Sequence, residues 1–264
     1  MRQQIIRIPE PSTPFKPSTL MRNRFSKASG RNDAFFGAAC ILGLVGLGLC
    51  SEARAQEASG PKISANVAVT SDYVFRGVSQ TQEDPALQAG VDLTQESFYA
   101  GAWASNVDFG DGETDAEIDL YAGVRPEFGG FDWDFGVVGY LYASQPDGAD
   151  YDYAEFKAAA SRAVGPATLG AAVYYSPDFF GASEDEATYA EVNGAFSPAD
   201  RWTLSGAVGR QWVSSDFDYT TWNVGASYQL TDRLALDVRY HDTDEHDFGD
   251  IYGSRAVATL KAAF

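Results

Sequence analysis

The sequence predicts an all-β protein, a transmembrane antiparallel β-barrel of about 12 strands, and three observations lead to this fold class. Segments of about ten residues with alternating polarity recur along the chain, as in the strands of outer-membrane barrels. The connections between these segments are alternately short and long, and the chain ends on Phe264. An even strand number places both termini on one side, so we expect periplasmic termini and long, acidic extracellular loops.

Residues 1–55 have the parts of a secretory signal peptide. An uncharged apolar run, 34–50, follows a basic region and precedes an A-x-A cleavage site formed by Ala53 and Ala55. We expect this segment to be cleaved after Ala55, with Met21 as an alternative start of the chain. The run is too short to be a typical spanning helix.

The exported part of the chain is strongly acidic. The chain holds 19 Lys and Arg and 37 Asp and Glu; residues 1–55 hold 8 and 3 of these, which leaves 11 and 34 and a formal charge of −23. Both cysteines lie in the leader, so no disulfide would stabilise the exported protein. We exclude nucleic acid as a partner, because binding it requires clustered Lys and Arg. We expect a short periplasmic segment at 56–61 and the barrel at 62–264.

Twelve alternating segments are candidate strands. They lie at roughly 62–77, 85–94, 98–107, 116–128, 131–142, 153–163, 167–176, 187–196, 202–212, 219–230, 233–241 and 254–264. The segment 131–142 shows the pattern well, with Phe131 and Phe135 on one face and Asp132 and Asp134 on the other.

Two of these segments leave their facing open. In 98–107 either face could point outward. In 202–212, Arg210 shares a face with Leu204 and Val208. Either a β-bulge or a guanidinium that reaches toward the headgroups would explain this arginine.

The connections differ in length and charge. The short ones lie at 95–97, 129–130, 164–166, 197–201 and 231–232. The others, mostly longer, lie at 78–84, 108–115, 143–152, 177–186, 213–218 and 242–253, and they contain acidic residues but no Lys or Arg. This asymmetry is typical of outer-membrane barrels, with short periplasmic turns and long extracellular loops.

The polar face of the strands separates a membrane barrel from a soluble barrel or sandwich. A soluble barrel points its apolar face inward, and so many charges could not be buried in a dry core. A wet lumen can accommodate them. The candidate pore-lining residues are Asp72, Arg76, Gln88, Asp92, Glu117, Asp119, Arg125, Asp132, Asp134, Glu155, Lys157, Glu191, Asp237 and Arg239.

The last strand carries alternating apolar residues to the end of the chain. Leu260, Ala262 and Phe264 share one face. Because termini of soluble domains usually fray, an aromatic last residue favours a strand that closes a barrel at the lipid boundary. We expect these residues to act as the signal for the barrel-assembly machinery.

Four segments, SDYVFRGVSQT (71–81), PALQAG (85–90), FYAGAWASNVDF (98–109) and EIDLYAG (117–123), resemble the TorF-type porin family of proteobacteria. The likeness is dense over 71–142 and looser afterward. It implies an exported barrel in the outer membrane of a Gram-negative bacterium, and it supplies no substrate.

Arg76 is the most suggestive candidate residue. We expect it in the first strand, facing the lumen near the extracellular mouth, where it would narrow the pore and orient an anionic group. The alternative is a structural ion pair with a carboxylate on a neighbouring strand, such as Asp92.

The segment HDTDEHDFGD (241–250) contains both histidines of the exported chain. A hydrolase would use His241 or His246 with Ser and acidic partners, but no such partners occur at a specific spacing. The oxygen ligands of the segment suit weak Ca²⁺ or Mg²⁺ binding between the loops and lipopolysaccharide. The candidate ligands are Asp242, Asp244, Glu245, Asp247 and Asp250.

These observations predict a non-enzymatic, porin-like channel that favours cations. Its expected partners are outer-membrane lipid, lipopolysaccharide, the assembly machinery and small solutes, with no cofactor other than loosely bound Ca²⁺ or Mg²⁺. The alternatives are a barrel that does not conduct and anchors envelope components, and an outer-membrane hydrolase.

Overall fold

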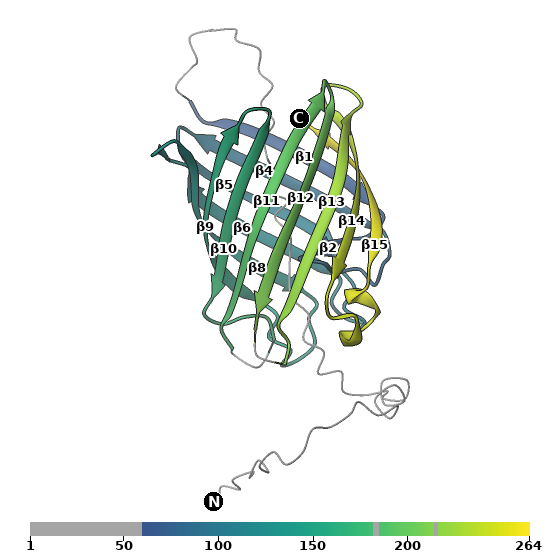
Figure 1. Cartoon of the computed structure of the whole chain (residues 1–264). Helices are drawn as coiled ribbons and strands as arrows, with labels where there is room; N and C mark the ends of the chain where they lie inside the picture. The colour runs from purple at the N-terminus through teal and green to yellow at the C-terminus, as the bar shows by residue number, and fades with distance from the viewer. Residues whose placement is uncertain (1–59, 182–184, 214–215) are drawn as a thin grey trace, which may run out of the picture. The chain divides into compact units, whose positions relative to one another are not determined.

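The computed structural model describes residues 60–181, 185–213 and 216–264. Twelve long strands form a closed antiparallel barrel, as the sequence predicts (Figure 1). These strands are β1 (Lys62–Thr70), β4 (Ala86–Gln95), β5 (Phe98–Asn106), β6 (Ala116–Val124), β8 (Phe131–Ala143), β9 (Tyr153–Val164), β10 (Ala167–Ser176), β11 (Ala187–Ala199), β12 (Trp202–Trp212), β13 (Tyr219–Gln229), β14 (Leu234–Thr243) and β15 (Arg255–Ala263). Strands adjacent in the sequence pair with each other, β1 pairs with β15 and β6 pairs with β8, so the wall has no free edge.

Smaller elements lie at the ends of the barrel and within it. A two-residue strand, β7 (Glu127–Phe128), extends the hairpin before β8. β2 (Val74–Phe75) and β3 (Val78–Ser79) form a separate two-stranded sheet. Two short 3₁₀ turns, η1 (His246–Phe248) and η2 (Asp250–Tyr252), precede β15. No helix in the described residues is both long and apolar enough to cross a membrane.

Apolar side chains cover the outside of the barrel. On β8, Phe135, Val137 and Leu141 are exposed, whereas Tyr140 and Tyr142, which point inward, are buried. The other strands repeat this arrangement, with exposed outward side chains that include Val69, Leu93, Leu120, Phe156, Val192 and Val224. The wall is therefore apolar outside and polar inside, the reverse of a soluble barrel.

The structure settles the two strands whose facing the sequence leaves open. On β5, Phe98 is exposed, and Trp103 points inward, with its ring centroid 5.3 Å from that of Tyr73. On β12, Arg210 pairs in regular register with both neighbouring strands, so no bulge surrounds it. Its Nη1 donates to Thr220 Oγ1 at 3.0 Å, and its Nη2 lies 3.8 Å from Asp218 Oδ2, in the connection before β13, so the guanidinium turns toward that end of the barrel.

The two ends of the barrel differ as the sequence predicts. Short turns lie at one end, here called the turn end, and long connections lie at the other, the loop end (Figure 1). The first predicted strand is wrong in its length, because β1 ends at Thr70 rather than at residue 77. The residues that follow leave the wall and pair with one another.

The end of the chain closes the barrel. Phe264 N donates to Ala65 O at 2.8 Å, and Ala65 N donates to Phe264 O at 3.1 Å. The Phe264 and Leu260 side chains point outward and are exposed. The last residue thus completes the seam between β15 and β1.

Candidate functional site

The segment between β1 and β4, residues 71–85, folds back into the barrel, and we call it the inserted hairpin. β2 and β3 are joined by the two-residue turn Arg76-Gly77, in which both φ angles are positive, at 42° and 89°. This is the backbone of a tight hairpin turn, which favours glycine. A Cβ at position 77 would also collide with Thr221 and Thr243, so only glycine fits there.

The inserted hairpin is enclosed by the barrel. Every residue from Asp72 to Thr81 is buried, and Figure 1 places β2 inside the ring of strands. Val78 is 1% exposed and Gln80 is 0% exposed. Burial this deep identifies the hairpin as an obstruction of the lumen near the loop end.

Arg76, at the tip, reaches the far wall. It is in a bidentate ion pair with Glu155 on β9, with Nη1–Oε1 at 2.9 Å and Nη2–Oε2 at 2.7 Å. Its Nη1 also donates to Gln211 Oε1 on β12 at 2.9 Å. The guanidinium lies 4.3 Å from the ring centroid of Tyr189 and 5.0 Å from that of Tyr174, distances at which a cation is attracted to an aromatic face.

This geometry corrects the sequence expectation for Arg76. The arginine is not in the first strand, and its ion-pair partner is Glu155 rather than Asp92, whose Oδ1 accepts from Tyr121. The reason is the turn at Arg76-Gly77, which carries the guanidinium away from β1 and across the lumen.

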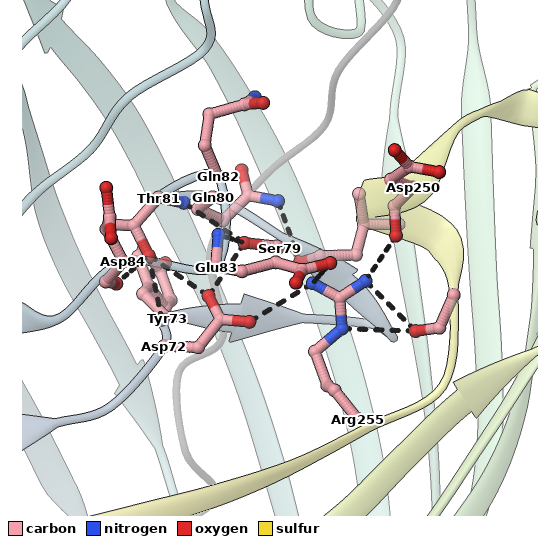
Figure 2. A network of polar contacts seen from close by, with 12 residues as sticks. Asp72, Tyr73, Ser79, Gln80, Thr81, Gln82, Glu83, Asp84, Asp250 and Arg255 are labelled. Carbon is pink, nitrogen blue, oxygen red and sulfur yellow. Dashed lines mark hydrogen bonds and ion pairs between the residues drawn. The ribbon is translucent and has the colours of Figure 1, made fainter.

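A second network holds the base of the inserted hairpin (Figure 2). Asp72 Oδ1 accepts from Ser79 Oγ at 2.7 Å and from Thr81 Oγ1 at 3.0 Å, while Asp72 Oδ2 accepts from Arg255 Nη1 at 3.1 Å. Arg255 Nη2 donates to the carbonyl oxygen of Asp250 at 2.8 Å. Arg255 thus joins the hairpin to the segment that carries η2.

Apolar contacts fill the space on both sides of the inserted hairpin. Tyr73 and Phe75 belong to a buried cluster with side chains from the wall and the loops, namely Ala86, Val107, Phe109, Val138, Tyr140, Tyr142, Tyr153, Phe179, Phe180 and Ala187. Val78 packs with Tyr219, Ile251 and Tyr252. The long loops, acidic in sequence, therefore also supply the aromatic side chains that cover the hairpin.

The turn-end part of the lumen contains half-buried polar networks. Asp134 Oδ2 accepts from Lys157 Nζ at 2.9 Å and from Arg125 Nε at 3.1 Å. Across the barrel, Arg239 pairs with Asp237 at 3.2 Å and donates to Asn223 Oδ1 at 2.7 Å. Each described cation in these networks contacts a carboxylate.

Most of the predicted lining residues lie on the inner face of the wall. They are Gln88, Asp92, Glu117, Asp119, Asp134, Glu155, Lys157, Glu191, Asp237 and Arg239. Asp72 and Arg76 lie on the inserted hairpin instead. Arg125 follows β6, and Asp132 is exposed near the start of β8, so both lie at the turn-end rim.

In the acidic segment before β15, the described residues show no preformed metal site. The described residues contain no group of three or more side chains placed to hold a metal ion. Asp242 Oδ1 instead accepts from Thr243 N and contacts His246 Nε2 at 2.7 Å, and Asp244 Oδ1 accepts from Thr220 N. The carboxylates of Asp242 and Asp244 thus order the loop.

A hydrolase site is also not assembled in the described part of the chain. His246 pairs with Asp242, but no serine is hydrogen-bonded to His241 or His246. The pair of His246 and Asp242 therefore has no serine beside it that could act as the nucleophile of a catalytic triad.

Sequence reasoning missed the residues that receive the hairpin, Tyr174, Tyr189 and Gln211, and the anchor Arg255. One local signal was available. In VFRGVS, the pairs Val-Phe and Val-Ser flank a two-residue segment ending in glycine, which is typical of a tight β-hairpin. No sequence pattern indicates which wall residues such a hairpin would contact.

Residues 54–264 match the model of a family described as "Bacterial protein of unknown function (Gcw_chp)". Among solved structures, the barrel is similar to the KdgM porin, with 9% identity and a TM-score of 0.55 over 76% of this chain and 99% of that one. It is also similar to the NanC porin, with 10% identity and a TM-score of 0.53 over 77% and 99%. No curated protein matches the sequence significantly. These matches do not confirm the TorF-type resemblance, but they support a porin-like barrel fold.

Proposed function

The chain belongs to the bacterial Gcw_chp family, whose function is unknown, and we propose that it is an outer-membrane, porin-like channel for passive diffusion of small solutes or ions. The observation that carries the proposal is the polarity of the wall. Large apolar side chains cover the outside, and charged and amide groups line the inside. Such a barrel is stable in lipid and encloses a polar path.

The inserted hairpin makes this a restricted channel. Twelve strands spaced by about 4.8 Å and tilted by about 40° enclose a backbone radius of roughly 12 Å. Wall side chains occupy much of this space, and the hairpin occupies the loop-end part of what remains. We therefore expect small conductance steps from the intact protein and larger ones when the hairpin leaves the lumen.

We further propose that the channel favours cations. The long connections contain acidic residues and no Lys or Arg. In the lumen, most cations are paired with carboxylates, while Glu117 and Asp119 have no cationic partner among the described residues. A negative field of this kind attracts cations and repels anions. The preference should weaken with salt, because the screening length falls from about 10 Å at 0.1 M to about 3 Å at 1 M.

Planar-bilayer recording tests the channel proposal. The purified wild-type barrel is compared with a variant in which residues 72–81 are replaced by a short Gly-Ser linker, and folding is checked by the different gel mobility of unheated barrels. We expect small steps from the wild type and larger steps from the variant. A folded variant without the hairpin that passes no current would overturn the proposal.

A non-conducting barrel remains the second candidate, and the depth of the inserted hairpin is the observation that favours it. Buried charges and aromatic contacts hold the hairpin on both sides, as expected of a permanent structural element. The same recording decides between the two functions.

We propose that the barrel is inserted by the outer-membrane assembly machinery, which would recognise the strand ending in Leu260, Ala262 and Phe264. Deleting Phe264 removes two backbone hydrogen bonds to Ala65, each contributing about 0.5–1.5 kcal/mol. We expect the yield in the outer membrane to fall much further than this loss of stability explains. Normal outer-membrane yield of the shortened chain would contradict the proposed signal.

A further inference from the structure

Two carboxyl groups lie side by side beneath the inserted hairpin. Glu117 and Asp119 on β6 are both 0% exposed, and they share the inner face because they are two residues apart. Side chains two residues apart on a strand are neighbours on one face, so the two carboxyl groups lie next to each other. The pair is therefore one acidic site in the driest part of the lumen.

The groups around this site include no free positive charge. The facing side chains are Trp103 and Ser105 on β5, Tyr140 and Tyr142 on β8, Tyr153 and Glu155 on β9, and Tyr73 and Arg76 on the inserted hairpin. Of these, only Arg76 is cationic, and both of its terminal nitrogens donate to Glu155. No described neighbour can neutralise a second charge on the pair.

The hydrogen bonds around Glu117 and Asp119 also disfavour a second negative charge on the pair. Glu117 Oε1 accepts from Tyr73 Oη at 3.1 Å, but Glu117 Oε2 and both Asp119 oxygens have no donor among the described residues. The Tyr142 hydroxyl, which lies across from Glu117, is also buried without a hydrogen-bond partner. Buried carboxylate oxygens without donors are strongly unfavourable. Two neighbouring carboxylates cannot both remain ionised in such surroundings, and one proton between them supplies a missing donor.

We infer that Glu117 and Asp119 share one proton while the hairpin is docked, and that loss of this proton releases the hairpin and opens the lumen. This inference rests on the proposed channel function. Release transfers the proton to water, and two adjacent negative charges remain on β6. Water can hydrate them only after the hairpin has moved, because Tyr73 covers Glu117 and packs against Trp103.

Proton-linked release gives the pH dependence of hairpin docking a definite direction. Protonation favours the docked hairpin, so the channel shows only small conductance steps at low pH and larger steps as pH rises. Because one proton is lost on release, the equilibrium between docked and released hairpin shifts by up to about tenfold per pH unit. A histidine switch is the alternative cause of a response near neutral pH, and His241 on β14 is the candidate, because it lies on a wall strand.

Single-channel recording over a pH series tests the inference with near-isosteric variants. In Asp119→Asn the amide replaces the shared proton as the donor to Glu117, and in Glu117→Gln the amide donates to Asp119. We expect both variants to keep the small conductance steps over the pH range in which the wild type changes to larger ones. His241→Gln, the matched control, should change to larger steps as the wild type does. A response that disappears in His241→Gln and persists in the two acidic-site variants would overturn the inference.

Thiol labelling of Val78→Cys reports release without requiring current. The sequence from Gln56 onward contains no cysteine, and Val78 is 1% exposed in the docked hairpin. Labelling is divided at each pH by the rate for the denatured chain, because the thiolate fraction itself rises with pH. We expect protection at low pH and a rise of up to about tenfold per pH unit, absent when Asp119→Asn is added.

Channel recording and thiol labelling together distinguish failure of the proposed channel function from failure of the proton-linked release. If labelling rises with pH but no variant conducts, the proposed channel function fails and the proton-linked release stands. If the barrel conducts but labelling and the size of the conductance steps do not depend on pH, the proton-linked release fails and the channel stands.

Discussion

The two halves of the lumen are built by the same strands, yet they hold their charges in different ways. In the loop-end half, Glu117, Asp119 and Glu155 are at most 1% exposed. In the turn-end half, the side chains of Asp134 and Asp237 are 17% and 27% exposed. The alternating pattern alone therefore does not determine how dry the lumen is. The inserted hairpin makes the difference.

A single substitution should matter most in the loop-end half of the lumen. An ion pair held in water contributes little, because water replaces a lost partner. A buried pair that loses one partner leaves a charge without compensation, which is strongly destabilising. The same chemical change should therefore have unequal effects in the two halves.

The largest effect is expected from Arg76→Ala. Loss of the guanidinium leaves Glu155 buried and unpaired, so docking of the hairpin should weaken by about 3–5 kcal/mol. Conductance should rise, and cation preference should rise with it, because a negative charge in the lumen is no longer balanced. Conductance and reversal potential in a salt gradient measure both.

The matched control for this substitution is Arg239→Ala in the turn-end half, where the partly exposed pair with Asp237 should make the loss smaller than at Arg76. If Arg76→Ala keeps the wild-type conductance and reversal potential in a folded barrel, the ion pair does not hold the hairpin.

Gly77→Ala should have the next largest effect. The turn needs a left-handed backbone, and a methyl group would collide with Thr221 and Thr243. We expect docking to weaken by at least about 1–3 kcal/mol, read as faster labelling of Val78→Cys. Gly130→Ala is the control, since Gly130 also has a positive φ but open space around it. Equal labelling in the two variants would argue against tight packing at the hairpin tip.

Asp237→Asn should change selectivity with little change in structure. It removes a carboxylate from the half-buried network around Arg239, and the stability loss should be under about 1 kcal/mol. The reversal potential should move toward anions, while labelling of Val78→Cys stays at the wild-type rate. Faster labelling of Val78→Cys would mean that the turn-end network affects docking of the hairpin, so that the two halves of the lumen are not independent.

The smallest effect is expected in a loop at low pH. Burial alone would raise the pKa of Asp111, but hydrogen bonds from Thr114 and from the backbone N–H groups of Glu113 and Thr114 outweigh it and lower the pKa. Their contribution is present above the unfolded pKa of about 3.9 and is lost as pH falls further. Hydrogen exchange at Glu113 and Thr114 should therefore accelerate at acidic pH. Asp111→Asn should remove this acceleration.

The sequence was sufficient for the wall because the wall obeys a local rule. Alternation at period two assigns each strand residue to a face, and lipid outside with charge inside follows from it. On β8 this rule places Phe135 outward and Tyr140 inward, as the structure confirms. It could not assign β5, where small residues make both faces alike.

The site was beyond sequence reasoning because its contacts are not local. Residues 71–77 continue the alternation of β1, so the pattern extends the strand past Thr70. Only the tertiary contacts of Arg76 with Glu155 and Gln211 show that the chain turns inward. Likewise, the five acidic candidates before β15 lie close in sequence, but hydrogen bonds with the backbone and with His246 direct Asp242 and Asp244 into the loop.

The position of the hairpin directly after the first strand also sets an order of folding. Arg76 is separated from Glu155 by 79 residues and from Gln211 by 135. Contacts this distant form late, because the intervening chain must be ordered first. The hairpin is synthesised early, but it can dock only when β9 and β12 are already in the wall. We therefore expect the hairpin to dock late, after most of the wall has formed.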